Sequence, residues 1–107
     1  MNKDQVIEIM SNRGFTVQSY SMKDTHTVEA VYFITEPVFQ NGSNAPAIGC
    51  NVFLEAGEFE FMYAVPFSIN ILRSPKCSPI VNDEHFNKIY SKFKEQACVL
   101  HNYFGRD

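Results

Sequence analysis

The chain has 107 residues, of which 45% are apolar and 14% aromatic, and its net charge is −3. A chain of this length and composition is expected to bury a core and fold as one domain, which excludes a disordered protein. The acidic balance argues against a general nucleic-acid binder, because such proteins carry a basic face that meets phosphate.

The cysteines and the apolar runs indicate where the protein is expected to reside. Cys50, Cys77 and Cys98 are too few and too scattered for a disulfide framework, which favours a reducing, cytoplasmic location. No apolar run has the length of a signal peptide or reaches the roughly 20 residues that cross a bilayer. We therefore expect no membrane partner.

The first third of the chain predicts a helix and a β-hairpin. Apolar side chains recur at helical spacing over residues 3–13, and Gly14 follows where a helix ends. Residues 15–22 and 27–35 are rich in β-branched and aromatic side chains, as paired strands are. Residues 37–46 combine two prolines with turn-forming residues, so an exposed, mobile loop is expected there.

The remainder predicts a second hairpin and a long helix. Strand-like residues 48–55 and 58–65 are joined by a short turn containing Gly57, and residues 67–72 are a candidate edge strand after Pro66. Asn82 or Asp83 then begins a helix that is expected to end at Gly105. Its apolar stripe has steps of three and four residues and consists of Phe86, Ile89, Tyr90, Phe93, Ala97, Leu100 and Phe104.

These elements define an α+β fold class. We expect one domain over residues 1–107, with an antiparallel sheet of four or five strands that contains two hairpins. A short N-terminal and a long C-terminal helix flank the sheet, in the order α-β-β-β-β-(β)-α.

Residues with chemical potential do not form a recognisable catalytic or cofactor motif. Cys98 and His101 are three residues apart on the last helix, but structural zinc sites supply such a ligand pair twice. Cys77, next to Lys76, is the only cysteine beside a positive charge, and none of the three histidines is its neighbour in the sequence. The sequence therefore predicts neither an enzyme nor a metal or cofactor site.

Alternation along the strands divides the expected sheet into two faces. The predicted core face contains Val28, Ala30, Tyr32, Ile34, Ile48, Cys50, Val52, Leu54, Phe59, Phe61, Tyr63 and Val65. The opposite face should be polar if it is wet. Instead it has an apolar centre and an acidic rim, which is typical of a partner-binding surface. Its predicted partner-binding residues are Val31, Phe33, Phe53 and Met62, with Glu29, Glu55, Glu58 and Glu60.

The sequence thus favours a small, non-enzymatic protein-binding protein of the adaptor, chaperone, immunity or inhibitor type. Its partner is expected to be another protein or a second copy of the chain, bound at the open sheet face or an edge strand. One alternative to an open face is that residues 67–72 or 37–46 fold over it. Two other functions remain open: a small enzyme or ligand-binding protein with a pocket at residues 73–79, and a nucleic-acid binder using Arg73, Lys76, Lys88 and Lys92.

Overall fold

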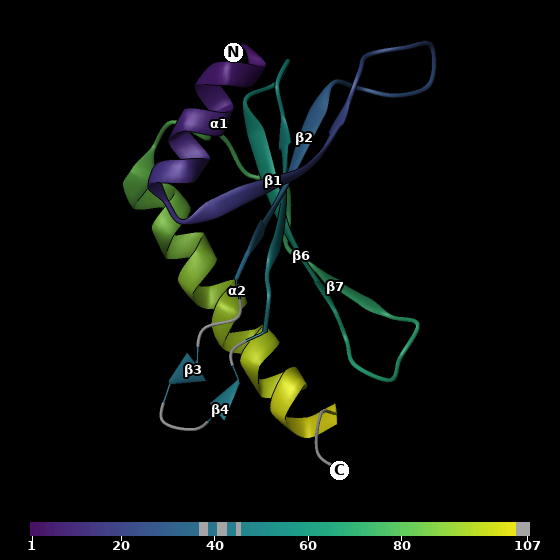
Figure 1. Cartoon of the computed structure of the whole chain (residues 1–107), viewed down its shortest axis with the longest axis vertical. Coiled ribbons are helices and arrows are strands. Elements are labelled where there is room, and N and C mark those ends of the chain that lie inside the picture. Colours follow the sequence, from purple (N-terminus) through teal and green to yellow (C-terminus); the bar gives the residue numbers. More distant parts are fainter. Residues whose placement is uncertain (37–38, 41–42, 45, 105–107) are drawn as a thin grey trace.

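A computed structural model describes residues 1–36, 39–40, 43–44 and 46–104. Five antiparallel strands form one open sheet, and both helices pack on the same side of it (Figure 1). The predicted α+β class and element order are confirmed. The elements are α1 (Lys3–Asn12), β1 (Phe15–Ser21), β2 (Ala30–Thr35), β3 (Phe39–Gln40), β4 (Ser43–Asn44), β5 (Gly49–Phe53), β6 (Glu58–Ala64), β7 (Ile71–Arg73) and α2 (Asp83–Phe104).

Side-chain caps define the first helix. Asn2 and Gln5 form a reciprocal capping box. The backbone N–H of Gln5 donates to Asn2 Oδ1 (2.8 Å), and the backbone N–H of Asn2 donates to Gln5 Oε1 (3.1 Å). After the helix Gly14 has a φ of +87°, a conformation that glycine adopts without the steric penalty of a side chain. Helix α1 buries Val6 and Met10 against the sheet, as its spacing predicted.

The long helix supplies most of the aromatic core. Asn82 caps it, since the His85 amide donates to Asn82 Oδ1 (3.0 Å). The ring centroids of Phe86 and Phe93 lie 5.2 and 5.7 Å from that of Phe61 on β6. The predicted stripe on α2 is confirmed from Phe86 to Leu100, whereas Phe104, its last expected member, is exposed. The expected end at Gly105 lies outside the described residues.

The two predicted hairpins form, and the expected edge strand is shifted along the chain. A β-bulge lies between Val17 and Ser19 in the β1–β2 pair, and Gly57, with a φ of +66°, lies in the β5–β6 turn. The edge strand expected over residues 67–72 begins only at Ile71. Residues 65–68 instead form the turn that leads into it, closed by a hydrogen bond from the Ser68 amide to the Val65 carbonyl (3.3 Å).

The predicted loop at residues 37–46 falls partly outside the described residues, namely at residues 37–38, 41–42 and 45. Between them, β3 and β4 pair with each other in a ladder separate from the main sheet. Within the described residues, neither α1 nor α2 is long and apolar enough to cross a membrane.

The predicted face of β2 is wrong. Val31 and Phe33, expected on the open face, are completely buried on the helix side, while Tyr32 lies on the opposite side and is half-buried. All six residues of β2 are apolar or weakly polar, so alternation does not identify the buried face. Pairing with β5 does, because Val31 lies beside Val52 and Phe33 beside Cys50, both of them core residues. A shift of one residue in the pairing register of a strand moves each of its side chains to the other face of the sheet.

Candidate protein-binding surface

The side of the sheet opposite the helices is called the outer face here. It is defined by the residues that alternate with the buried ones along strands β2, β5, β6 and β7. Neither helix covers it, and Figure 1 shows the β1–β2 and β6–β7 connections projecting away from the helices. Its members are Ala30, Tyr32, Ile34, Asn51, Phe53, Glu58, Glu60, Met62, Ala64, Ile71 and Arg73.

The centre of the outer face is polar. Glu60 is only 7% exposed, and its Oε1 accepts a hydrogen bond from Asn51 Nδ2 (3.3 Å). Arg73 approaches the same oxygen with its Nη1 at 3.9 Å. A buried carboxylate needs such partners, because burial removes it from water. Glu60, predicted as part of an acidic rim, is therefore engaged within the sheet rather than free on its margin.

A small hollow of about 190 Å³ lies at the end of the outer face where β5 turns into β6. Phe53 forms part of its wall, and Lys76 Nζ lies 4.7 Å from the centre of that ring. Three carboxylates also line this hollow, and one of them, on Glu55, pairs with Lys23 at 3.3 Å. The hollow is therefore an aromatic patch in acidic surroundings. Its lining residues are Val28, Glu29, Phe53, Glu55, Ala56, Glu58 and Lys76.

A second, larger hollow of about 390 Å³ lies at the opposite end and is mostly apolar. The Tyr32 ring lies across Gly49 so closely that a Cβ at Gly49 would be 2.1 Å from the tyrosine oxygen. The hollow extends to Tyr63, whose hydroxyl shares a 2.7 Å hydrogen bond with His101 Nδ1. Burial raises the pKa of Tyr63. The other lining residues are Ile34, Pro46, Ala47, Met62, Ala64, Pro66 and Ile71.

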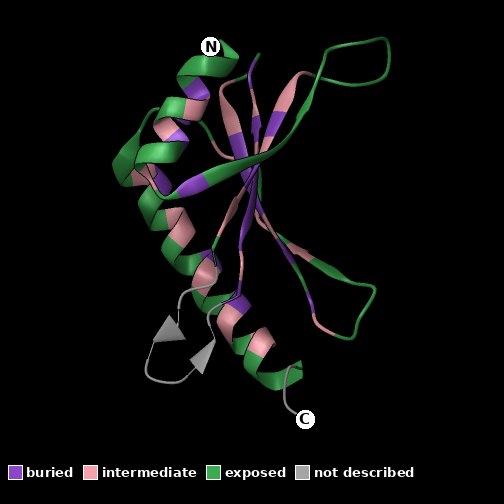
Figure 2. Cartoon of the chain, in the orientation of Figure 1, coloured by how far each residue is buried: buried purple, intermediate pink, exposed green. Residues whose placement is uncertain are grey.

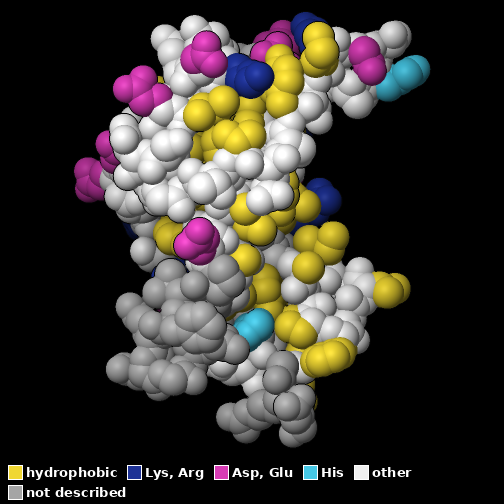
Figure 3. All heavy atoms as spheres, in the orientation of Figure 1, with side chains coloured by type: hydrophobic (Ala, Val, Ile, Leu, Met, Phe, Trp, Pro, Cys, Tyr) yellow, Lys and Arg dark blue, Asp and Glu magenta, His cyan; other side chains and the backbone are white. Residues whose placement is uncertain are grey.

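Beside the larger hollow, the tip of the β6–β7 hairpin exposes large apolar side chains. Phe67 is 88% exposed and Ile69 fully exposed, and Ile71 at the base of the hairpin is half-exposed. Residues 67–70 at the tip are exposed, as the green loop of Figure 2 shows, and Figure 3 shows hydrophobic side chains gathered over this hairpin. The sequence predicted a strand over residues 67–72 and did not predict this exposed tip. The signal that could have indicated it is Pro66, a turn-forming residue followed directly by apolar residues.

The backbone at the tip is itself unusual. Phe67 is the third residue of the turn over residues 65–68, directly after Pro66, and its φ is +57°. A turn with proline second and a positive φ third normally has glycine at the third position, because an L side chain is strained there. The chain therefore holds a phenylalanine, in a conformation that glycine adopts more readily, with its ring in solvent.

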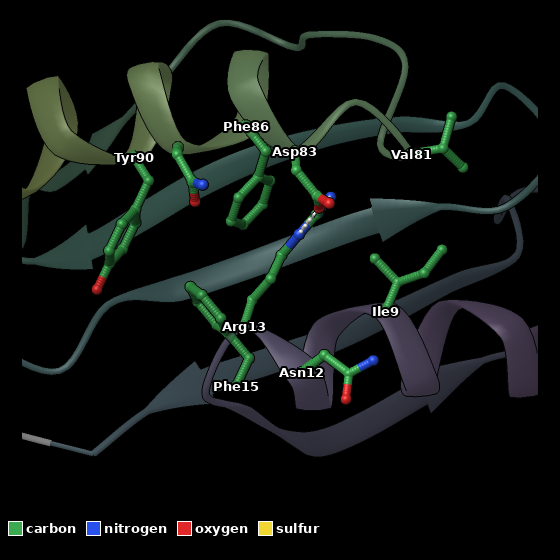
Figure 4. A pocket seen from close by; sticks show the side chains of 9 residues that line it. Ile9, Asn12, Arg13, Phe15, Val81, Asp83, Phe86 and Tyr90 are labelled. Carbon is green, nitrogen blue, oxygen red and sulfur yellow. Dashed lines mark hydrogen bonds and ion pairs between the residues drawn. The ribbon is translucent and has the colours of Figure 1, made fainter.

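The cleft between the ends of α1 and α2 has a structural explanation. Arg13, whose side chain is 9% exposed, pairs with Asp83, donates to the Ile80 carbonyl (2.8 Å) and stacks on Phe86 with its Cζ 4.1 Å from the ring centre (Figure 4). The surrounding cleft has a volume of about 440 Å³. Two of these contacts join the end of α1 to the first turn of α2 and the third joins it to the segment before α2, so Arg13 acts as a clamp between the helices.

The residues of the two alternative functions are distributed over different parts of the surface. Cys77 pairs by backbone with Phe59, and neither Cys77 nor Arg73 lines the hollow that contains Lys76. Arg73 lies on the outer face, whereas Lys92 lines a groove on the helix side. Within the described part of the chain, no group of three or more histidine, cysteine or acidic side chains is arranged to hold a metal ion.

Of the predicted partner-binding residues, the structure thus keeps six near the outer face and moves two into the core. Phe53 and Met62 are half-buried on it, while Glu29, Glu55 and Glu58 surround Phe53. Val31 and Phe33 are inaccessible to a partner.

Comparison with known proteins places this chain in no family: no family model, curated protein or solved structure matches it. What the fold defines is a small α+β domain whose antiparallel sheet has both described helices on the same face.

Proposed function

We propose that this chain is a non-enzymatic protein-binding protein that holds an apolar segment of another protein against the outer face and the β6–β7 tip. The observation that carries the proposal is Phe67, exposed in a turn position where glycine would be less strained. Strained residues that persist in a fold mark sites of function more often than chance placement would. Phe67 and the neighbouring Ile69 have no packing role within the described residues that explains them.

The shape of the outer face supports an extended partner. The two hollows lie at opposite ends of β6, and a strand rises about 3.3 Å per residue, so roughly 20 Å separates the ends of this seven-residue strand. An extended segment of about six residues spans that distance. The larger hollow and the hairpin tip offer it apolar contact, which is the main source of binding energy at protein interfaces.

The acidic side chains around Phe53 favour one orientation of the bound partner segment. Glu29, Glu55 and Glu58 surround that hollow together with one lysine. A partner segment with an apolar end at the hairpin and a lysine or arginine at the Phe53 end is complementary to both hollows. Such charge pairing at the margin of an interface controls orientation and association rate more than affinity.

Selection of peptides from a random phage-displayed library on the immobilised chain tests this proposal. We expect apolar peptides with a basic end, whose binding Phe67→Gly weakens at least about tenfold, the loss typical of an interface anchor. Because glycine relieves the strained φ at this position, Phe67→Gly should fold at least as stably as the parent, so lost binding cannot be ascribed to unfolding.

Met22→Ser is the matched control, since Met22 is 72% exposed in the β1–β2 connection and its loss should leave peptide binding unchanged. Peptides that bind Phe67→Gly as tightly as the parent, or no selectable peptide at all, would contradict the proposal. Chemical-shift changes on adding a selected peptide should be concentrated on the outer face, from Tyr32 to Met62 and the hairpin tip.

A further inference from the structure

The free edge of β7 presents backbone groups at two positions. Hydrogen bonds link Ser74 to Phe61 (3.0 Å) and Val65 to Asn70 (3.3 Å) across the β6–β7 pair. In an antiparallel ladder the bonded residues alternate, so Leu72 also bonds toward β6. The N–H and C=O groups of Ile71 and Arg73 therefore point to the open edge, one on each side of Leu72.

Apolar side chains border this edge on the helix side. A groove of about 640 Å³ separates β7 from α2, and Leu72 lies at its strand side. Val99 on α2 is 65% exposed in the groove although it is a large apolar residue. Its charged lining residues are one lysine and one glutamate, so the groove has no net charge. Its lining residues are Leu72, Lys92, Glu95, Gln96, Val99 and Leu100.

The opposite edge of the sheet lacks these properties. Strand β1 has a bulge between Val17 and Ser19, and bulges disrupt the regular row of donors and acceptors that another strand needs. Its exposed side chains are largely polar, and Lys3 of α1 lies 4.6 Å from the ring of Tyr20. Within the described residues, strand β7 is protected by its shortness and by Pro75, which has no N–H at the next outward position.

We infer that a second copy of this chain covers the β7 edge, with a two-fold axis through Leu72. In that arrangement Ile71 of one copy exchanges both backbone hydrogen bonds with Arg73 of the other, and the reverse pair is formed by symmetry. The two five-stranded sheets become continuous, and both outer faces remain on the same side. The Leu72 side chains meet at the axis, and each Val99 is brought toward the other copy's groove.

Self-complementarity is the reason for assigning a second copy rather than a foreign strand. The outward backbone groups are symmetric about Leu72, and a neutral groove with one lysine and one glutamate complements a copy of itself. A foreign strand gains only the backbone bonds of a three-residue edge, because Pro75 interrupts the ladder. A second copy adds its own α2 and therefore the burial of Val99 and Leu100.

Light scattering behind a sizing column, over a range of concentrations, tests the inference on the full chain. We expect a dimer that dissociates on dilution, and Val99→Arg should raise its dissociation constant by at least about tenfold. Val99 is exposed in the single chain, so this variant should keep its circular dichroism and its unfolding midpoint. Met22→Arg, which adds the same charge at an exposed site near the other edge, should remain dimeric.

Two further variants separate this inference from the proposed function. Ile71→Pro removes an N–H that the single chain leaves unused, so it should yield a folded monomer, whereas Phe67→Gly should remain a dimer. Amide exchange at Ile71 and Arg73 should be slow in the parent and fast in Val99→Arg. A parent chain that is monomeric at its highest soluble concentration overturns the inference, as does a dimer that Val99→Arg and Ile71→Pro leave intact.

Discussion

The two faces of the sheet are built from the same strands but have opposite character. On the helix side, Val31, Val52 and Phe59 lie side by side across β2, β5 and β6, and all three are completely buried. One residue further along, Tyr32, Asn51 and Glu60 form the corresponding row of the outer face. The comparison teaches that register aligns apolar side chains of neighbouring strands under α1 and α2, and that the same register aligns polar side chains on the uncovered face.

The largest effect should come from removing matching aromatic rings on the two faces. Phe33→Ala leaves a cavity in the core and should lower the free energy of unfolding by about 3–5 kcal/mol. Phe53→Ala, on the half-buried outer face, should lower it by roughly 1 kcal/mol. Chemical denaturation measures both values. Equal losses would mean that the outer face is as thoroughly covered as the core.

A smaller effect is expected within the outer face, where Tyr32 lies across Gly49. A Cβ at Gly49 cannot be accommodated without moving this ring, so Gly49→Ala should lower the free energy of unfolding by about 1–3 kcal/mol. In a Tyr32→Ala background the same change should have little effect, because the obstructing ring is absent. Additive losses in the double variant would show that the ring does not cover Gly49 in solution.

The smallest effect concerns reactivity rather than stability. Cys50 on the helix side is completely buried, and burial raises its pKa, whereas Cys77 and Cys98 are half-buried. A thiol reacts as thiolate, so a disulfide reagent at mildly alkaline pH should modify Cys77 and Cys98 in the folded protein and Cys50 only after denaturant is added. Mass spectrometry identifies the modified residues. Early modification of Cys50 would show that the core face opens readily.

The sequence alone determined both helices and the first two hairpins of the sheet, because their signals are local. The stripe of Phe86 and Phe93 identified α2, Gly14 indicated the end of α1, and Gly57 indicated the β5–β6 turn. The same locality explains why Phe53 and Met62 were assigned to the outer face correctly, since their strands alternate clearly between polar and apolar residues.

Only the tertiary structure decided which side of β2 is buried and how the hairpin tip is presented. Residues 30–35 have no polar alternation, so the position of Val31 and Phe33 depends on register with β5, a contact between residues distant in sequence. The exposure of Phe67 depends in the same way on where β7 resumes pairing with β6. Local pattern specifies an element, but the choice of face and edge arises from pairing between elements, which a single strand's sequence does not contain.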